Sequence, residues 1–367
     1  MVVNQTFWKN KTVLITGHTG FKGGWLSLWL SQLGANVVGY ALAPPSTPSF
    51  FVATQLENHL HSIIGDVRDA EFFAKSVKHY QPEIIFHLAA QSLVRPSYQN
   101  PIETYATNVM GTVHVLDAAR QCDSVRALVN VTTDKCYANR EWVWSYRETD
   151  TLGGHDPYSN SKACSELVTD AFRSAFFNEK KTLGLASARA GNVIGGGDWS
   201  QDRLLPDIIS AYYAKQPVVI RYPDAIRPWQ HVLEPLSGYL LLAEKLYAEP
   251  QRFSQAWNFG PEQNDIKSVR WIVERMRKLM GNDVSWQLSD AVQPHEAQLL
   301  KLDSAKAKTH LAWYPHWPLE KTLDQTLHWY TAYYGQENVF DLSVKQLQQY
   351  STQQFKPFTI MEKVEHV

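Results

Sequence analysis

Six short apolar runs rich in Val, Ile and Leu recur through the first half of the chain, with helix-like segments between them. Each run is nearly continuous rather than alternating, which is typical of strands that are covered on both faces. The intervening segments are long enough to hold one crossover helix each, as a parallel connection requires. The runs are KTVLIT (11–16), NVVGY (36–40), HSIIG (61–65), EIIFHL (83–88), RALVNV (126–131) and TLGLASA (182–188).

This alternation predicts an α/β fold with a doubly wound parallel sheet of right-handed βαβ units, a Rossmann domain, over residues 1–190. Beyond that point the pattern loosens. A glycine-rich stretch (191–206) precedes helical segments at 205–216 and 268–281, with short extended pieces between them. We therefore expect residues 191–367 to form a second, smaller α/β lobe that binds substrate, with some interleaving of segments between the two.

The composition of the chain excludes several classes of partner. Its 35 Lys and Arg balance 36 Asp and Glu, and the basic footprint that nucleic acid or an anionic membrane requires is absent. The longest apolar stretch near a helix, residues 236–248, is shorter than the roughly 20 residues of a membrane span. The amino terminus has no signal-peptide pattern. Three cysteines without a C-x-x-C pairing favour a reducing compartment, so we expect a cytoplasmic protein. The histidines show no metal-ligand spacing, so we expect no metal site.

A glycine-rich segment, TGHTGFKG (16–23), joins the first predicted strand to a predicted helix. Gly17, Gly20 and Gly23 form G-x-x-G-x-x-G, which lets the backbone turn tightly and approach a pyrophosphate at the helix amino terminus. A glycine-rich turn kept for close packing is the alternative, and the position between strand and helix favours dinucleotide binding. Lys22 within this loop either pairs with a phosphate or is an exposed lysine.

The segment after the second predicted strand, GYALAPPSTP (39–48), lacks the acid that usually binds the adenosine ribose. It also lacks an arginine to receive a 2′-phosphate, which favours NAD over NADP. Asp66 follows the third predicted strand, where a carboxylate can accept a hydrogen bond from an adenine amino group. An ordinary turn aspartate is the alternative there.

A Tyr and a Lys occupy one face of a helix that is predicted to begin near residue 157. Asp156 suits its amino-terminal cap and Pro157 its first position, and Tyr158 and Lys162 follow four residues apart. The ammonium is expected to lower the pKa of the phenol from about 10 toward neutrality, so that Tyr158 accepts the proton of a hydroxyl that is being oxidised. This spacing also occurs by chance, and the glycine loop upstream favours the catalytic interpretation.

Several motifs together resemble the extended short-chain dehydrogenase/reductase family, and within it the nucleotide-sugar 4,6-dehydratases: TGHTGFKG, HLAAQ (87–91), YATNVMGT (105–112), VTTDKCY (131–137), YSNSKACSE (158–166) and RAGNVIGGGDW (189–199). The resemblance implies NAD as a cofactor that is regenerated in each turnover, and a nucleotide-sugar substrate. The cofactor site that it implies comprises Gly17, His18, Thr19, Gly20, Phe21, Lys22, Gly23, Asp66, Val67, Leu88, Ala89, Ala90, Asn108, Thr132, Tyr158 and Lys162.

The implied reaction oxidises carbon 4 of the sugar, eliminates water across carbons 5 and 6, and returns the hydride to carbon 6. Thr133 is expected to bind the carbon 4 oxygen beside Tyr158, and a protonated Asp134 to protonate the departing carbon 6 hydroxyl. Lys135 stands where many relatives have a glutamate as the base for the carbon 5 proton. We expect Lys135 to be neutral and to act as this base; the alternative is a cationic lysine that stabilises the enolate.

Most residues that the resemblance assigns to the substrate lie in the second lobe, and their arginines suit a diphosphate. The alternative for each arginine is a surface ion pair, and the alternative for Trp257 is a place in the core. The candidates are Ser92, Arg95, Asn192, Arg203, Leu204, Arg227 and Trp257.

Other functions stay open at this point. Epimerases of the family resemble the chain throughout but carry a small hydroxyl or aliphatic residue in place of Asp134, and a dehydratase for another nucleotide sugar would share every motif. A non-catalytic dinucleotide sensor would have no need of Tyr158, Lys162 and Asp134. The resemblance also implies a homodimer or a dimer of dimers, paired through the helix of Tyr158 and the helix before it.

Overall fold

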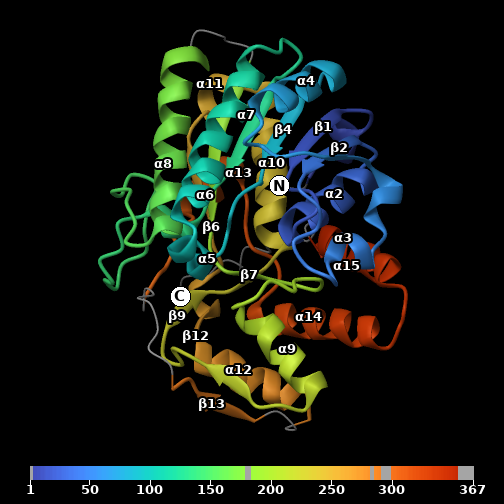
Figure 1. Cartoon of the computed structure of the whole chain (residues 1–367), viewed down its shortest axis with the longest axis vertical. Helices are drawn as coiled ribbons and strands as arrows, with labels where there is room; N and C mark the ends of the chain where they lie inside the picture. Colours follow the sequence, from blue (N-terminus) through green and yellow to red (C-terminus); the bar gives the residue numbers. More distant parts are fainter. Residues whose placement is uncertain (1–2, 178–182, 282–284, 291–298, 354–367) are drawn as a thin grey trace, which may run out of the picture.

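A seven-stranded parallel sheet forms the centre of the computed structural model, which describes residues 3–177, 183–281, 285–290 and 299–353 (Figure 1). The strand order is β11-β6-β5-β4-β1-β2-β3. The order reverses between β1 and β4, as in doubly wound sheets, so the predicted fold class is confirmed. The strands are β1 (Thr12–Thr16), β2 (Asn36–Ala41), β3 (His61–Ile64), β4 (Ile84–His87), β5 (Ala127–Val131), β6 (Gly184–Ala190) and β11 (Ala256–Phe259).

Six of these strands lie where the apolar runs predicted them, although residue 182 of the last run lies outside the described residues. The seventh strand, β11, was not predicted. It has four residues, and one of them is Asn258, whose buried amide bonds to Tyr137 and Tyr146. So short a run with a polar residue inside it does not stand out from a loop.

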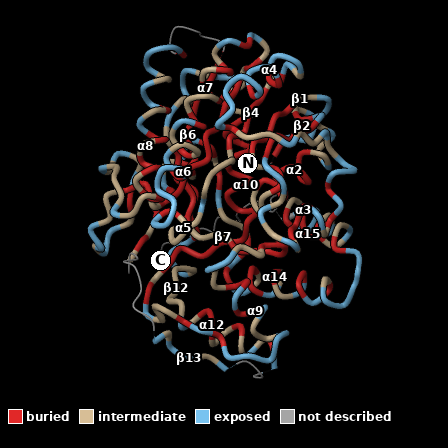
Figure 2. Tube along the Cα trace, in the orientation of Figure 1, coloured by how far each residue is buried: buried red, intermediate tan, exposed pale blue. Residues whose placement is uncertain are grey.

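Helices cover both faces of the sheet, which explains the continuous apolar runs. Leu14, Ile85 and Leu128 pack toward α4 and α7, whereas Val13 and Ile15 point to the face covered by α2 and α10. Figure 2 shows the buried segments in the middle of the molecule and exposed ones along its outer helices. The main covering helices are α2 (Phe21–Gln32), α4 (Ala70–Tyr80), α7 (Gly111–Arg120), α8 (Pro157–Phe172) and α10 (Leu233–Ala248).

Shorter elements connect these layers in the first part of the chain. They are α1 (Gln5–Trp8), α3 (Phe50–Ala53), η1 (Leu56–His59), α5 (Val94–Gln99), α6 (Pro101–Tyr105), η2 (Ala106–Met110), η3 (Asp134–Cys136) and η4 (Arg173–Phe177). No helix within the described ranges is both long and apolar enough to span a bilayer.

A second lobe contains three two-stranded sheets and lies beyond the carboxyl ends of the main strands (Figure 1). The sheets pair β7 (Val193–Ile194) with β10 (Gln230–His231), β8 (Val218–Ile220) with β13 (Trp286–Leu288), and β9 (Ile226–Pro228) with β12 (Ile266–Ser268). Helices α9 (Leu204–Ala214) and α12 (Val269–Leu279) and the turn η5 (Gln263–Asp265) also lie in this lobe, and α14 (Leu319–Tyr334) packs on β7 and β10. Helices α11 (Pro250–Phe253), α13 (Ala305–Leu311) and α15 (Val339–Gln353) pack instead on β6, β11 and α2.

The chain returns from the second lobe to the main sheet. Helix α10 packs on β5 and β6, and β11 pairs in parallel with β6. Several elements that follow residue 190, among them α10, α11, β11 and α13, therefore pack with the main sheet, and the division into two domains at this residue stays a prediction.

Candidate active site

A cavity of about 640 Å³ lies at the carboxyl ends of the strands, where the strand order reverses. Ligands of doubly wound proteins bind at this position. Because the strands are parallel, the segments that follow β1, β4, β5 and β6 meet there. The predicted residues that line the cavity are Gly17, Thr19, Gly20, Phe21, Lys22, Gly23, Asp66, Val67, Leu88, Ala89, Ala90, Ser92, Arg95, Thr132, Thr133, Asp134, Lys135, Tyr158, Lys162, Asn192, Arg203, Leu204 and Arg227.

His18 belongs to the glycine loop, but its side chain does not line the cavity. The imidazole is fully buried, its Nε2 lies 2.7 Å from Ser62 Oγ of β3, and its ring fills the space over Gly39 of β2. Burial lowers the pKa of His18 to about 4. The prediction of a cofactor contact for this side chain is therefore corrected: it packs the sheet beneath the loop.

Asn108 and Trp257 also lie away from the cavity. The Asn108 amide accepts from Gln91 N and donates to Gln91 O, both at 2.9 Å, so it supports the loop after β4 from behind. Trp257 is 1% exposed, and its indole donates to Phe253 O at 3.0 Å. Trp257 does not line the cavity and its ring stacks on Phe253 in the core, which agrees with the alternative of a core tryptophan and not with the expected contact with the base.

The glycine loop fits a dinucleotide phosphate. Gly17 has φ +80°, and a Cβ on Gly23 would lie 2.1 Å from Gly17 O, so the turn and the start of α2 require glycines. Gly20 caps α2 without any side-chain hydrogen bond to its first turn. The amino terminus of the helix thus faces the cavity with its partial positive charge available to an anion.

Asp66 lies at the cavity wall beyond β3 and is held by a neighbour. It accepts hydrogen bonds from the backbone N of Arg68 at 2.8 Å, from Nε at 2.8 Å and from Nη2 at 2.6 Å. These bonds hold the pKa of Asp66 below its usual value. Arg68, which the sequence analysis did not single out, fixes the carboxylate at the side of the cavity away from the second lobe.

Asp134 begins the short helix η3 directly after β5 and is 2% exposed. Its Oδ1 accepts from Thr133 Oγ1 at 3.0 Å, and its Oδ2 has no hydrogen-bond partner within the described part of the chain. Burial raises the pKa of Asp134, against the opposing charge of Lys135 and the bond from Thr133. The arrangement favours the protonated form of this carboxyl group.

Tyr158 and Lys162 both line the cavity from α8, and both are nearly buried. Burial raises the pKa of Tyr158 to about 12, although its hydrogen bond with Thr133 opposes this. The expected lowering of the phenol pKa by Lys162 is thus not found. The Lys162 ammonium donates to Val131 O at 3.2 Å, and its burial lowers the pKa of Lys162 to about 8.

Lys22 points into the reaction centre, so the alternative of an exposed lysine is wrong. Burial lowers the pKa of Lys22 to about 7, with further lowering by Arg203 and Lys162 and an opposing effect of Asp134. The amino group of Lys22 therefore lies close enough to Lys162 and Asp134 for their charges to affect it. Lys135 is half-buried and also lines the cavity, next to Asp134.

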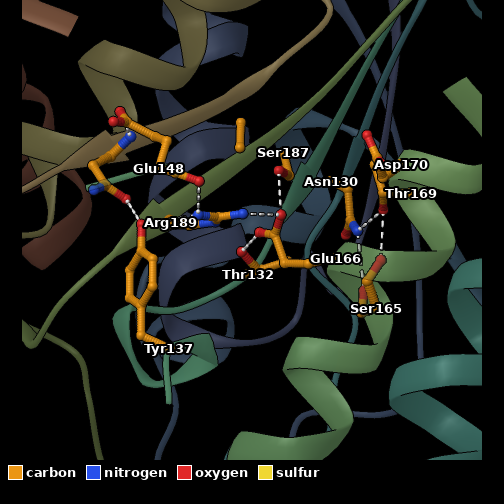
Figure 3. Close-up of polar contacts among 12 residues, drawn as sticks. Asn130, Thr132, Tyr137, Glu148, Ser165, Glu166, Thr169, Asp170, Ser187 and Arg189 are labelled. Carbon is orange, nitrogen blue, oxygen red and sulfur yellow. Dashed lines mark hydrogen bonds and ion pairs between the residues drawn. The ribbon is translucent and has the colours of Figure 1, made fainter. Parts of the chain in front are cut away.

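A polar network centred on Glu166 lies behind this wall (Figure 3). Glu166 of α8 accepts from Arg189 Nη2 at 2.8 Å, from Ser187 Oγ at 2.6 Å and from Thr132 Oγ1. Burial opposes ionisation, yet Arg189 and these hydrogen bonds keep the pKa of Glu166 below its usual value. The network joins α8, β6 and the end of β5. Sequence reasoning missed it, since nothing in the spacing indicates that these side chains meet.

Cation and carboxylate pairs line the outer part of the cavity, in the second lobe. Arg203 donates to Asp198 at 2.9 Å. Asp202 binds Arg95 at 3.1 Å and Arg221 at 2.8 Å, which ties α5 of the first domain to β8 of the second lobe. Sequence reasoning did not find Asp198, Asp202 or Arg221. No cluster of metal-binding side chains occurs in the described ranges, and the three cysteines are free.

Comparison with known proteins places this geometry in a family. A family model described as GDP-mannose 4,6 dehydratase matches residues 14–326. The CDP-glucose 4,6-dehydratase of Salmonella typhimurium (strain LT2) is 53% identical over 353 residues, which cover 95% of this chain and 98% of that protein. The dTDP-glucose 4,6-dehydratase of Xanthomonas campestris pv. campestris is 26% identical over 338 residues, covering 87% and 93%.

Solved structures share the fold. The crystal structure of dTDP-glucose 4,6-dehydratase from Bacillus anthracis in complex with NAD has 21% identity and a TM-score of 0.74, over 88% of this chain and 96% of that chain. The sequence motifs, the lined cavity and the family match agree with one another. The chain therefore belongs to the GDP-mannose 4,6 dehydratase family, within the extended short-chain dehydrogenase/reductase group.

Proposed function

We propose that the protein is a CDP-glucose 4,6-dehydratase, a hydro-lyase that converts CDP-glucose to CDP-4-keto-6-deoxyglucose and water with NAD as cofactor. The observation that carries the proposal is the buried Asp134, with a raised pKa, in one cavity with Tyr158. The choice of CDP-glucose rests on the relative of that name at 53% identity. Such a product serves deoxysugar synthesis, for example for the O-antigen of lipopolysaccharide.

NAD, when bound, supplies the acceptor and later the donor of the sugar hydride. The glycine loop before α2 would hold its pyrophosphate, and the segments after β3 and β4 would hold its adenosine and nicotinamide halves. Arg68 in the cavity wall is bonded to Asp66 and is therefore not available to bind a 2′-phosphate, which favours NAD over NADP. The cavity wall formed by Leu88, Ala89 and Ala90 offers an apolar surface to a flat ring.

Tyr158 takes the proton from the carbon 4 hydroxyl as the hydride leaves. Thr133, hydrogen-bonded to the phenol, is positioned to bind the same oxygen. A pKa of about 12 keeps the phenol neutral, so a positive charge brought into the cavity is needed to make it a base near neutral pH. Lys162 and Lys22 supply positive charge on the protein side.

Asp134 gives its proton to the hydroxyl that leaves carbon 6. Hydroxide is a poor leaving group, so an acid must protonate it as the bond breaks. The unpartnered Oδ2 and the raised pKa of Asp134 support this role. Lys135, adjacent in the cavity wall, takes the carbon 5 proton that the carbon 4 ketone has made acidic, a step that requires the neutral amine. Replacing Lys135 by Met and following exchange of the carbon 5 proton with solvent deuterium tests this step, and unchanged exchange would exclude it.

Two other functions of the same scaffold compete with this one. An epimerase would need no acid at position 134, so the buried carboxyl favours a dehydratase. A dehydratase for another nucleotide would keep the same centre and differ in the outer cavity. A dinucleotide sensor would have no reason to bury Asp134 and Lys162 in a ligand cavity.

The direct experiment offers the purified protein CDP-glucose, dTDP-glucose, UDP-glucose and GDP-mannose, each with NAD. A 4-keto-6-deoxy sugar absorbs strongly in alkali, which identifies the substrate that loses water. We expect CDP-glucose to be dehydrated fastest. Epimerised sugar without water loss would contradict the proposal, and so would the absence of turnover with all four.

The assembly is part of the proposal: a homodimer or a dimer of dimers that pairs through α8 and the helices before it. Apolar side chains exposed on these elements support it, with Ile102 at 85%, Leu167 at 58% and Met110 at 48% exposure. Light scattering of the purified protein tests it, and a monomer at micromolar concentration would exclude it. A cytoplasmic location is proposed from the three free cysteines and is tested by cell fractionation.

A further inference from the structure

A carboxylate in the outer part of the cavity has no role in the proposed chemistry. Asp207 lies in the first turn of α9, and its backbone N donates to Arg203 O at 3.0 Å, so one helical turn separates the two residues. Arg203 faces the reaction centre, where its charge acts on Tyr158 and Lys22. Asp207 is one turn farther out along the same cavity wall.

The hydrogen-bonding capacity of the Asp207 side chain is unused among the residues that the structure describes. Its charged neighbours are engaged with one another, since Arg95 and Arg221 both bind Asp202. Partial burial raises the pKa of Asp207 to about 6; Arg221 and Arg95 oppose this, and Asp202 and Asp198 add to it. Asp207 is exposed on the cavity wall, so its carboxylate is open to a donor of a bound ligand.

The length of a nucleotide sugar decides which part of it meets Asp207. With the hexose at Tyr158 and Asp134, the diphosphate comes next and the nucleoside lies farthest out. A carboxylate beside the diphosphate would repel it, so Asp207 faces the nucleoside. Apolar residues of β8 and α12, Val219 and Val269, line the same part of the cavity and suit the faces of a flat base.

We propose that Asp207 selects cytosine by accepting a hydrogen bond from its 4-amino group. Cytosine carries an amino donor at this position, whereas uracil and thymine carry an oxygen acceptor. One carboxylate therefore attracts cytosine and repels the other two pyrimidines. The inference rests on the proposed function and deepens it, because it names the residue that chooses among nucleotide sugars sharing one reaction centre.

The test measures binding of free CDP and free UDP by calorimetry, to the NAD-loaded wild type and to Asp207→Asn. We expect the wild type to prefer CDP. In the variant, CDP binding weakens about 10- to 100-fold, while UDP binding holds or strengthens because the amide donates to the uracil oxygen. Asp207→Ala should also lose the preference, since it removes both the attraction and the repulsion.

Asp224→Asn is the matched control, because Asp224 is exposed, pairs with Arg270 at 3.1 Å and does not line the cavity. It should keep the preference for CDP. Equal weakening of CDP and UDP in Asp207→Asn would assign the carboxylate to the ribose and overturn the proposal, as would an unchanged preference in both Asp207 variants. Thermal melting confirms that each variant is folded.

Turnover provides a second readout. The ratio of kcat/KM for CDP-glucose to that for UDP-glucose should fall in Asp207→Asn by the same factor as the binding preference, with the loss mainly in KM. The proposed function and this inference fail in different ways. A wild type that dehydrates no CDP-glucose sinks the function, whereas the binding preference for CDP over UDP and its loss in Asp207→Asn test Asp207 alone.

Discussion

Two buried carboxyl groups lie on opposite sides of the end of β5 and have opposite properties. Asp134 is 2% exposed and Glu166 is 4% exposed, so solvent access does not separate them. Glu166 accepts from Arg189 and Ser187, and its pKa lies below the usual value. Asp134 has one oxygen without a partner, and its pKa is raised. Partners, rather than burial, decide which carboxyl group is ionised.

The two residues that follow β5 separate the two carboxyl groups. Thr132 donates to Glu166 behind the sheet, and the next residue, Thr133, donates to Asp134 in the cavity. Adjacent residues of an extended chain point to opposite sides, so one strand supplies both bonds. The paired side, that of Glu166, joins α8 to the sheet through hydrogen bonds. The unpaired side, that of Asp134, favours a protonated acid that the reaction can use.

The largest expected effect follows from removing the acid of the unpaired side. Asp134→Asn keeps the shape but has no acidic proton, so dehydration should slow by about 10²- to 10⁴-fold. Oxidation at carbon 4 does not require this proton, so reduced nicotinamide should accumulate, visible by its near-ultraviolet absorbance. Dehydration at the wild-type rate would break the distinction between the two carboxyl groups.

Removing the charge of the paired side should affect stability instead. Glu166→Gln leaves Arg189 buried without its counter-ion, which costs about 3–5 kcal/mol of unfolding free energy. Urea titration measures it. The double variant Glu166→Gln/Arg189→Met should recover part of the loss, because no unpaired charge is left.

A surface pair provides the control. Arg252 binds Glu249 at 3.2 Å and their side chains are 63% and 47% exposed, so Glu249→Gln should change stability by no more than about 0.5 kcal/mol. A loss as large in this control as in Glu166→Gln would show that burial of the Glu166 pair does not matter.

The pH dependence of stability should run in opposite directions for the two groups. The folded state raises the pKa of Asp134, so its stabilising contribution is complete at low pH and is lost as pH rises through the folded value. Wild type should therefore lose stability relative to Asp134→Asn as pH rises from the ordinary carboxyl pKa, about 4, through the raised value of the folded state, by about 1.4 kcal/mol for each unit of raised pKa.

The Glu166 contribution has the other sign. Its folded pKa is lowered, so the stabilisation is complete above the unfolded value and is lost as pH falls through the folded one. Urea titrations of both variants and the wild type at pH values on both sides of the ordinary carboxyl pKa, about 4, measure the two slopes. Parallel slopes would remove the distinction.

The sequence predicts the unpaired side better than the paired side. Motifs are local: Asp134 follows a strand, the loop glycines precede a helix, and Tyr158 and Lys162 share a helix face, so each was placed in the cavity. The pair of Glu166 and Arg189 depends on how α8 packs on β6, and no spacing reveals that. The pKa of Tyr158 was missed for a related reason, because Lys162 donates to Val131 O instead.

The strands of the sheet, too, were predicted where their signal is local in the sequence. Six continuous apolar runs predicted six strands, whereas β11 contains the polar Asn258 and joins the sheet from the far half of the chain. Trp257 in this strand was assigned to the substrate, since a sequence does not show which side of a short edge strand faces the core.

The smallest effects come from the two threonines, and the same substitution in each sharpens the comparison. Thr132→Val removes a bond to the ionised Glu166 and should lower the unfolding free energy by about 1.5 kcal/mol. Thr133→Val removes the hydroxyl that bonds Asp134 and Tyr158 and should lower kcat about tenfold with less change in stability. Urea titration and steady-state rates on both variants measure this. If the two valines exchanged these effects, the division of the strand end into a structural and a chemical side would be wrong.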